Sequence, residues 1–108
     1  NVDNVRSQMR KGMLEYCIFI VVAQKSRHML GYHSKIERSP AHCSRRDALS
    51  AAYPAEKTND LLSYEWVEST QGPPRKYYSL TPQGETFLSG LEAAWEELAN
   101  TVNHLKNN

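Results

Sequence analysis

A chain of 108 residues is long enough for one domain, whose modest core would gain from a partner subunit. Hydrophobic residues make up 40% of the chain, which argues against a disordered protein. The formal net charge is only +1, but residues 1–57 carry ten Lys or Arg against five Asp or Glu, and residues 58–108 carry three against seven. A basic first half and an acidic second half suit a nucleic-acid-binding surface followed by a solvated helix.

The sequence predicts no metal, no cofactor and no enzyme activity. Cys17 lies in an apolar run, and the three histidines and Cys43 within residues 28–43 match no closed zinc motif. No nucleophile–base pair, paired carboxylates or phosphate loop is recognisable. The apolar run of residues 17–23 is far shorter than the roughly 20 residues of a membrane span. We therefore expect a cytoplasmic protein without a signal peptide or membrane partner.

The first predicted helix covers about residues 8–24, and the polar residues 1–10 are expected to fray. Its β-branched run could also form a buried strand, but the flanking residues are good helix formers. Arg10 and Lys11 would lie on the solvent side, either merely solvated or in contact with DNA phosphates. The apolar face is formed at spacings of three and four by Leu14, Cys17, Ile18, Val21 and Val22.

Residues 26–57 show no sustained apolar periodicity. Within them, residues 47–57 favour a weak helix with several alanines on its faces. Pro54 is expected to interrupt that helix, because proline removes a backbone donor and clashes with the preceding turn.

Residues 61–80 predict a β-hairpin. Polar side chains alternate with aromatic or branched ones in residues 63–67, and the alternation returns in residues 77–80. The intervening residues 69–74 read S-T-Q-G-P-P, in which Gly72 can take positive φ and the two prolines end strand pairing.

Two cations, Arg75 and Lys76, follow the loop where it meets the returning strand. A basic hairpin tip suits contact with a nucleic-acid backbone, and the alternative is a solvated strand edge that discourages edge pairing. The adjacent Tyr77 and Tyr78 must point to opposite faces, and Tyr77 is predicted to be the core residue.

The last predicted helix runs from Pro82 to about residue 105, with Thr81 as its N-cap. At 1.5 Å per residue it would be roughly 35 Å long. Its apolar residues follow a heptad spacing of three and four, which favours a partner helix over packing on its own domain alone. The predicted dimer interface therefore comprises Leu88, Leu91, Trp95, Leu98, Val102 and Leu105.

The hairpin resembles the wing of the PadR-like transcriptional regulators. Residues 64–84, Y-E-W-V-E-S-T-Q-G-P-P-R-K-Y-Y-S-L-T-P-Q-G, match the family motif G-x-x-R-[KR]-Y-Y-x-L-T-x-x-G. Residues 9–18, M-R-K-G-M-L-E-Y-C-I, resemble the family's first helix, and Trp95 in an amphipathic final helix also matches. The resemblance covers about two-thirds of the chain.

The resemblance implies a mainly α (α+β) winged helix-turn-helix fold. It implies a DNA-binding domain in residues 1–81 and a dimerisation helix in residues 82–108. The expected function is a homodimeric repressor of transcription that binds double-stranded DNA and releases it when a small aromatic or lipophilic effector binds at the dimer interface. The candidate DNA contacts are Arg75, Lys76, Arg10 and Lys11.

Trp95 and Phe87 are the candidate effector-binding residues, Trp95 by stacking on a planar compound. Trp95 could instead simply fill the dimer core. A second reading of the chain as a whole is a dimeric winged-helix adaptor that binds proteins and has lost DNA binding, which the irregular middle segment and the modest net charge favour.

Residues 26–57 depart from the family pattern, which has a recognition helix of the form E-G-T-[LI]-Y-P-x-L-x-R-L. A family-like peptide, L-I-V-V-E-G-T-L-Y-P-L-L-T-R-L-K, can be written in codons that read as residues 41–56 when translation starts one nucleotide early. We therefore hypothesise that about residues 26–57 are a frame-shifted reading of a family gene. Mass spectrometry of peptides from residues 41–56 distinguishes the two readings, and recognition-helix residues cannot be assigned by name.

Overall fold

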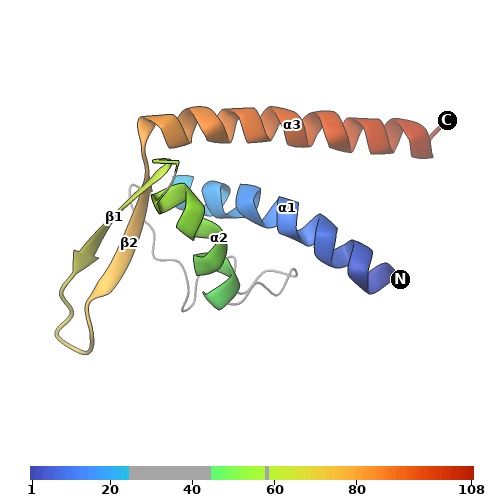
Figure 1. Ribbon diagram of the computed structural model, residues 1–108. Coiled ribbons are helices and arrows are strands. Elements are labelled where there is room, and N and C mark those ends of the chain that lie inside the picture. The colour runs from blue at the N-terminus through green and yellow to red at the C-terminus, as the bar shows by residue number, and fades with distance from the viewer. Residues whose placement is uncertain (25–44, 58) are drawn as a thin grey trace.

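The computed structural model describes residues 1–24, 45–57 and 59–108. Figure 1 shows the elements within these residues. In chain order they are helix α1 (Val2–Ala23), helix α2 (Arg45–Lys57), strands β1 (Leu62–Val67) and β2 (Arg75–Leu80), and helix α3 (Pro82–Lys106). A mainly helical chain with one antiparallel hairpin and a long last helix confirms the predicted winged-helix fold class.

Helix α1 begins at Val2, so the prediction that residues 1–10 fray is wrong. The Asn1 side chain accepts a hydrogen bond of 3.0 Å from the Asn4 backbone N–H and so caps the first turn. Asp3 adds a negative charge in that turn, where it interacts favourably with the helix dipole, and lies 3.3 Å from Arg6. Local capping therefore extends the helix over a stretch that lacks a strong apolar pattern.

Helix α2 is continuous from Arg45 to Lys57, so Pro54 does not interrupt it as predicted. Proline at this position removes the N–H that would bond to the Ser50 carbonyl, and the helix ends three residues later. The Pro54 carbonyl instead accepts the Asn59 N–H at 3.1 Å, which helps to terminate the helix. Of residues 26–57, which depart from the family pattern, residues 26–44 lie outside the described residues.

The hairpin register assigns each side chain of the wing to one of two faces. Leu62 pairs with Leu80 and Tyr64 with Tyr78, and directly opposed residues share a face. Because Leu62 is buried in the core, this register places Tyr78 on the core face, where only 2% of it is exposed. The prediction of Tyr77 as the core tyrosine is therefore wrong.

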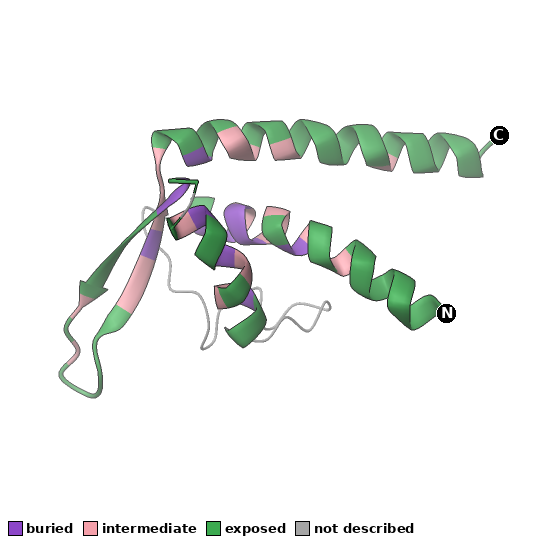
Figure 2. Cartoon of the chain, in the orientation of Figure 1, coloured by how far each residue is buried: buried purple, intermediate pink, exposed green. Residues whose placement is uncertain are grey.

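The core lies where α1, α2, the hairpin base and the beginning of α3 meet. Figure 2 shows buried residues concentrated at this junction, with both long helices exposed away from it. Phe19 and Ile18 of α1 are its largest fully buried side chains together with Leu62 and Val22. The contribution of α2 is small in volume. Its buried core residues are Ala48, Ala52 and Ala55, and the partly buried Leu49 and Ala51 pack against the core.

The backbone of Leu61 connects three elements. Its N–H donates to the Ala55 carbonyl of α2 at 2.8 Å, and its carbonyl accepts the Thr81 N–H at 3.1 Å. Thr81 caps α3 as predicted, since its hydroxyl oxygen accepts the Gly84 N–H at 2.9 Å. The same hydroxyl donates to the carbonyl of Asp60 at 2.7 Å, and Asp60 has a left-handed φ of 53°.

Helix α3 leaves this junction and extends toward the side on which the N-terminus of α1 lies, so the two long helices run in opposite directions (Figure 1). Its first three turns pack on the core through Phe87, Leu88 and Leu91, whereas its C-terminal half is exposed. The Cα radius of gyration is 15.5 Å, larger than the about 13 Å of a compact domain of this length. The division into residues 1–81 and 82–108 stays a prediction, because the start of α3 is part of the core.

We expect Gly84→Ala to lower the free energy of unfolding by about 1–3 kcal/mol. A Cβ at Gly84 would collide with the backbone carbonyl oxygen of Leu61, which is held in place by the hydrogen bond from the Thr81 N–H. Gly90→Ala in the same helix is the matched control, because its Cβ would meet open space. In the control, the free energy of unfolding should rise by about 0.5–1 kcal/mol, because alanine has the better helix propensity. Urea unfolding followed by circular dichroism measures both, and equal effects of the two substitutions would contradict the close approach at Gly84.

Candidate functional site

The two cations of the wing point to opposite faces. Lys76 is opposite Trp66, and Arg75 is opposite Val67, so they belong to successive pairs of the register. Side chains of successive strand residues alternate between the faces of a sheet. The structure therefore does not bring Arg75 and Lys76 together into one basic tip, although both lie on β2 as predicted.

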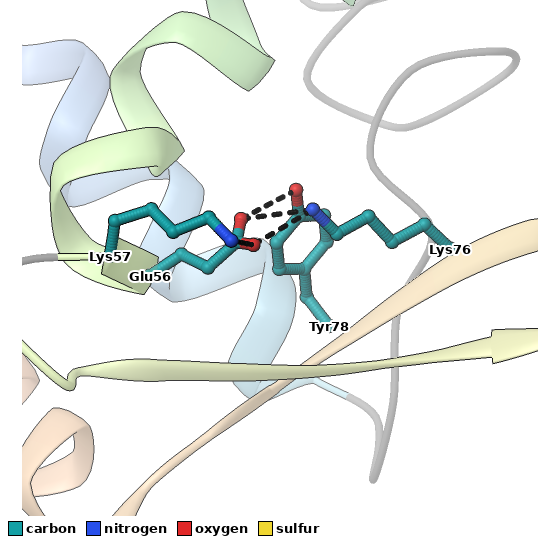
Figure 3. Close-up of polar contacts among 4 residues, drawn as sticks. All are labelled: Glu56, Lys57, Lys76 and Tyr78. Atoms are coloured by element: carbon teal, nitrogen blue, oxygen red, sulfur yellow. Dashed lines mark hydrogen bonds and ion pairs between the residues drawn. The ribbon is translucent and has the colours of Figure 1, made fainter.

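Lys76 lies on the face that packs toward α2, where it binds Glu56. Its ammonium donates to the two carboxylate oxygens of Glu56 at 2.9 and 3.1 Å. The Tyr78 hydroxyl donates to the same carboxylate at 3.2 Å. Figure 3 shows these three side chains facing one another, with the Lys57 ammonium 3.6 Å from the carboxylate. We call Glu56, Lys76 and Tyr78 the Glu56 cluster.

Burial and charge both act on the Glu56 cluster. Desolvation lowers the pKa of Lys76, but the hydrogen bonds to Glu56 and Tyr78 outweigh it and raise the pKa above its ordinary value. Desolvation is also the largest cause that raises the pKa of the Tyr78 phenol. Lys76 is therefore a cation and Tyr78 a neutral hydrogen-bond donor at neutral pH.

Arg75 differs from Lys76 because its side chain is directed to the solvent. It is exposed, and its guanidinium has no side-chain hydrogen bond or ion pair within the part of the chain that the structure describes. An unoccupied guanidinium at the wing is well suited to bidentate contact with a phosphate. Of the four cations predicted from the sequence, Arg75 has the placement that best fits such a contact.

The remaining two predicted cations lie on α1. Lys11 is exposed, as predicted. Arg10 is half-buried, and its guanidinium lies 3.6 Å from the carboxylate of Asp47 in α2. Arg10 therefore connects α1 to the first turn of α2, and its prediction as a DNA contact stays untested.

The two candidate effector-binding residues have different surroundings. Phe87 packs on Phe19 with ring centroids 5.3 Å apart and belongs to the edge of the core. Trp95 lies two turns further along α3, where its ring is 6.1 Å from that of Tyr16 and 47% of the residue is exposed. Desolvation, and then the negative charges of Glu92 and Glu96, raise the pKa of the Tyr16 phenol.

The predicted dimer seam is divided between two environments. Leu88 and Leu91 pack against the core of their own chain. From Trp95 onward the seam is open to solvent, with Leu98, Val102 and Leu105 exposed by 64%, 54% and 70%. On α1, Val2, Val5 and Met9 are also exposed and line a shallow apolar surface depression. Within the described parts of the chain, apolar side chains are thus exposed at the ends of both long helices.

Among the described residues, no group of three or more His, Cys, Asp or Glu side chains could hold a metal ion. The histidines and Cys43 of residues 28–43 lie outside the described residues. None of the helices in the described ranges is long and apolar enough to span a membrane.

Solved structures of regulators share this arrangement. A PadR-like transcription factor from Bacteroides fragilis is 49% identical, with 94% of this chain and 98% of that chain covered and a TM-score of 0.71. The chain therefore belongs to the PadR-like transcriptional regulators. A comparison with models of protein families gave no match, and neither did a comparison with curated proteins.

Two further solved structures extend the similarity to more distant sequences. A PadR-like transcriptional regulator from Bacillus cereus is 26% identical, covers 94% of this chain and 98% of its own, and has a TM-score of 0.78. A Streptococcus transcriptional regulator is 29% identical over 92% of this chain and 97% of its own, with a TM-score of 0.75. The family resemblance that rests on the wing motif is thereby confirmed for nearly the whole chain.

The sequence did not indicate two residues of the site. Glu56 was missed because no pattern in the sequence relates the end of α2 to the second strand of the hairpin. Tyr16 was missed because a tyrosine beside an apolar helix face is common, and its contact with Trp95 depends on how α1 crosses α3.

Proposed function

We propose that this PadR-like regulator is a homodimer that binds double-stranded DNA in the cytoplasm and represses transcription. The similarity to a transcription factor at 49% identity over nearly the full chain carries this proposal. A repressor on a promoter excludes the transcription machinery. An effector relieves repression only if it binds the DNA-free state more tightly than the DNA-bound state.

In the proposed complex, α2 enters the major groove and the wing lies along the neighbouring backbone. The exposed Arg75 supplies a phosphate contact, which contributes affinity and salt dependence rather than sequence choice. Lys11 is a second exposed cation that is open for such a contact. Sequence choice would depend on side chains of α2 and is not assigned to named residues.

We expect Arg75→Gln to weaken binding to the duplex upstream of the protein's own gene by about 10–100-fold, through loss of a charge-assisted hydrogen bond. The slope of log affinity against log salt should fall by about 0.9 per subunit. Arg6→Gln is the matched control, because Arg6 pairs with Asp3 at the far end of α1. Fluorescence anisotropy at several salt concentrations measures both quantities. A folded wild-type protein that binds no duplex at low salt would instead favour the protein-interaction adaptor.

The exposed apolar seam of α3 supports dimerisation. Large apolar side chains that share one helix face are characteristic of surfaces that another protein covers. Trp95, Leu98 and Val102 repeat at the heptad spacing of a helix pair. The exposed Val2, Val5 and Met9 at the end of α1 extend the apolar surface that a second copy would cover.

We expect Leu98→Glu to raise the dimer dissociation constant at least about 100-fold, because each leucine side chain contributes about 1.5–3 kcal/mol on burial and a dimer contains two. Asn100→Glu introduces the same charge on the opposite side of the helix and should leave the dimer intact. Sedimentation equilibrium measures the constants. A wild-type monomer at micromolar concentration, or equal effects of both substitutions, would contradict dimerisation through this seam.

Trp95 is the proposed binding residue for a small aromatic or lipophilic effector. Its half-exposed indole lies beside the Tyr16 ring, so two aromatic side chains are available to a planar compound. Phe87 belongs to the same helix face but is engaged with Phe19. Phe87 would therefore line the core side of the binding site for such a compound.

We expect an acridine dye to quench Trp95 fluorescence in a Trp66→Phe background, where Trp95 is the remaining tryptophan. Trp66 lies on the wing and its emission would otherwise obscure the signal. Adding Trp95→Ala should abolish dye binding measured by equilibrium dialysis, because the stacking surface is lost. Equal dye binding with and without Trp95 would show that this tryptophan only fills the dimer core.

A further inference from the structure

The carboxylate of Glu56 is a buried charge that requires an explanation. Its side chain is only 3% exposed, and it lies at the C-terminal end of α2, where a negative charge opposes the helix dipole. A buried charge is tolerated when it is paired and hydrogen-bonded. Its hydrogen-bond partners are Lys76 and Tyr78, which both belong to β2, and the neighbouring Lys57 ammonium lies 3.6 Å away.

The ammonium of Lys76 is enclosed rather than free. Besides Glu56, it contacts three aromatic rings of its own sheet face. The distances to the ring centroids are 4.1 Å for Tyr64, 5.1 Å for Tyr78 and 5.7 Å for Trp66. Movement of Lys76 to a phosphate would leave Glu56 without this partner. The structure thus favours a role for Lys76 inside the protein.

The Glu56 cluster acts on the wing at a distance from its base. The base is fixed by the hydrogen bonds of Leu61 to α2 and to Thr81. Lys76 lies four residues along β2 from Leu80, which pairs at the base, or about 13 Å away at the rise of a strand. The contact with Glu56 therefore fixes a second point of the hairpin and with it the angle between the wing and α2.

We propose that the Glu56 cluster holds the wing at the angle to α2 that lets both elements reach one DNA duplex, and that Lys76 is a positioning residue rather than a phosphate contact. This inference rests on the proposed DNA binding. It assigns the phosphate contact of the wing to Arg75, which lies on the opposite face of the hairpin.

Swapping the charges of Lys76 and Glu56 distinguishes a positioning role of Lys76 from a phosphate contact. The variants are Lys76→Glu, Glu56→Lys and the double variant, each measured by anisotropy with the labelled duplex upstream of the protein's own gene. Each single variant should bind at least about tenfold more weakly, because a misplaced wing loses its contact. The double variant has the net charge of the wild type and should recover binding to within a fewfold.

Two outcomes would overturn the proposal. If Lys76 contacts phosphate, the double variant stays as weak as Lys76→Glu. If the local charge alone matters, Glu56→Lys adds a cation and binds DNA more tightly than the wild type, whereas the proposal expects weaker binding. The salt dependence gives an independent criterion once the Arg75 contact is removed: in an Arg75→Gln background, Lys76→Met should leave the slope of log affinity against log salt unchanged. A further fall of the slope by about 0.9 per subunit in that background would identify a phosphate contact of Lys76.

Hydrogen–deuterium exchange tests the positioning without DNA. Exchange in residues 62–80 should accelerate in each single variant, stay unchanged in α3 and return to the wild-type rate in the double variant. Unaltered exchange in the single variants would overturn the proposal. If a charge-reversed variant does not fold, Glu56→Gln and Tyr78→Phe replace it, and both should accelerate exchange in the wing. If the wild-type protein binds no duplex but the variants show this exchange pattern, DNA binding is refuted and the role of the cluster in holding the wing remains.

Discussion

The contact between Leu61 and Gly84 is the constraint on which the arrangement of the elements depends. Leu61 is bound to α2 through its N–H and to Thr81 through its carbonyl, and α3 begins directly against that carbonyl. A side chain at Gly84 would force these groups apart. Because α2, the hairpin and α3 all meet at the backbone of one residue, their relative directions are determined there. A small displacement at this point becomes a large one at the tip of the wing or the end of α3.

A fixed base does not by itself fix an element that extends far from it. The wing projects from the junction as a two-stranded ribbon, and an isolated ribbon of this kind is only marginally stable in water. The Glu56 cluster adds a second point of contact between the ribbon and α2. Helix α3 has a corresponding pair of contacts with α1, through Phe87 on Phe19 and Trp95 on Tyr16.

The sequence predicted the elements whose determinants are local. The hairpin strands, the Thr81–Pro82 start of α3 and the apolar face of α1 each depend on neighbouring residues, and each is confirmed. The start of α1 was misjudged because a single side-chain cap at Asn1 outweighs the weak apolar pattern that follows it. Pro54 was misjudged because its position near the end of α2 limits the damage to one missing backbone donor.

What could not be predicted depends on how separate elements meet. The position of Tyr78, by contrast, was predictable: it lies two residues before the apolar Leu80, and residues two apart on a strand share a face. No such rule relates Glu56 to Lys76, which are brought together only by the packing of α2 on the hairpin. Adjacent cations in a sequence therefore say little about shared function when they lie on a strand, because the pleat sends them to opposite faces and into different surroundings.

The two ends of the molecule present different chemistry, and the core connects them. Arg75 and the wing lie on one side of the junction, and the exposed apolar ends of α1 and α3 lie on the other (Figure 1). In the proposed dimer the exposed half of α3 sets the separation of the two wings. Trp95 and Tyr16 lie where α3 passes from the core to that exposed half. The proposed ligand between them would act on the angle between the exposed half of α3 and the core. Because close-packed cores transmit displacement rather than absorb it, such a change would alter the spacing at which both wings meet one duplex.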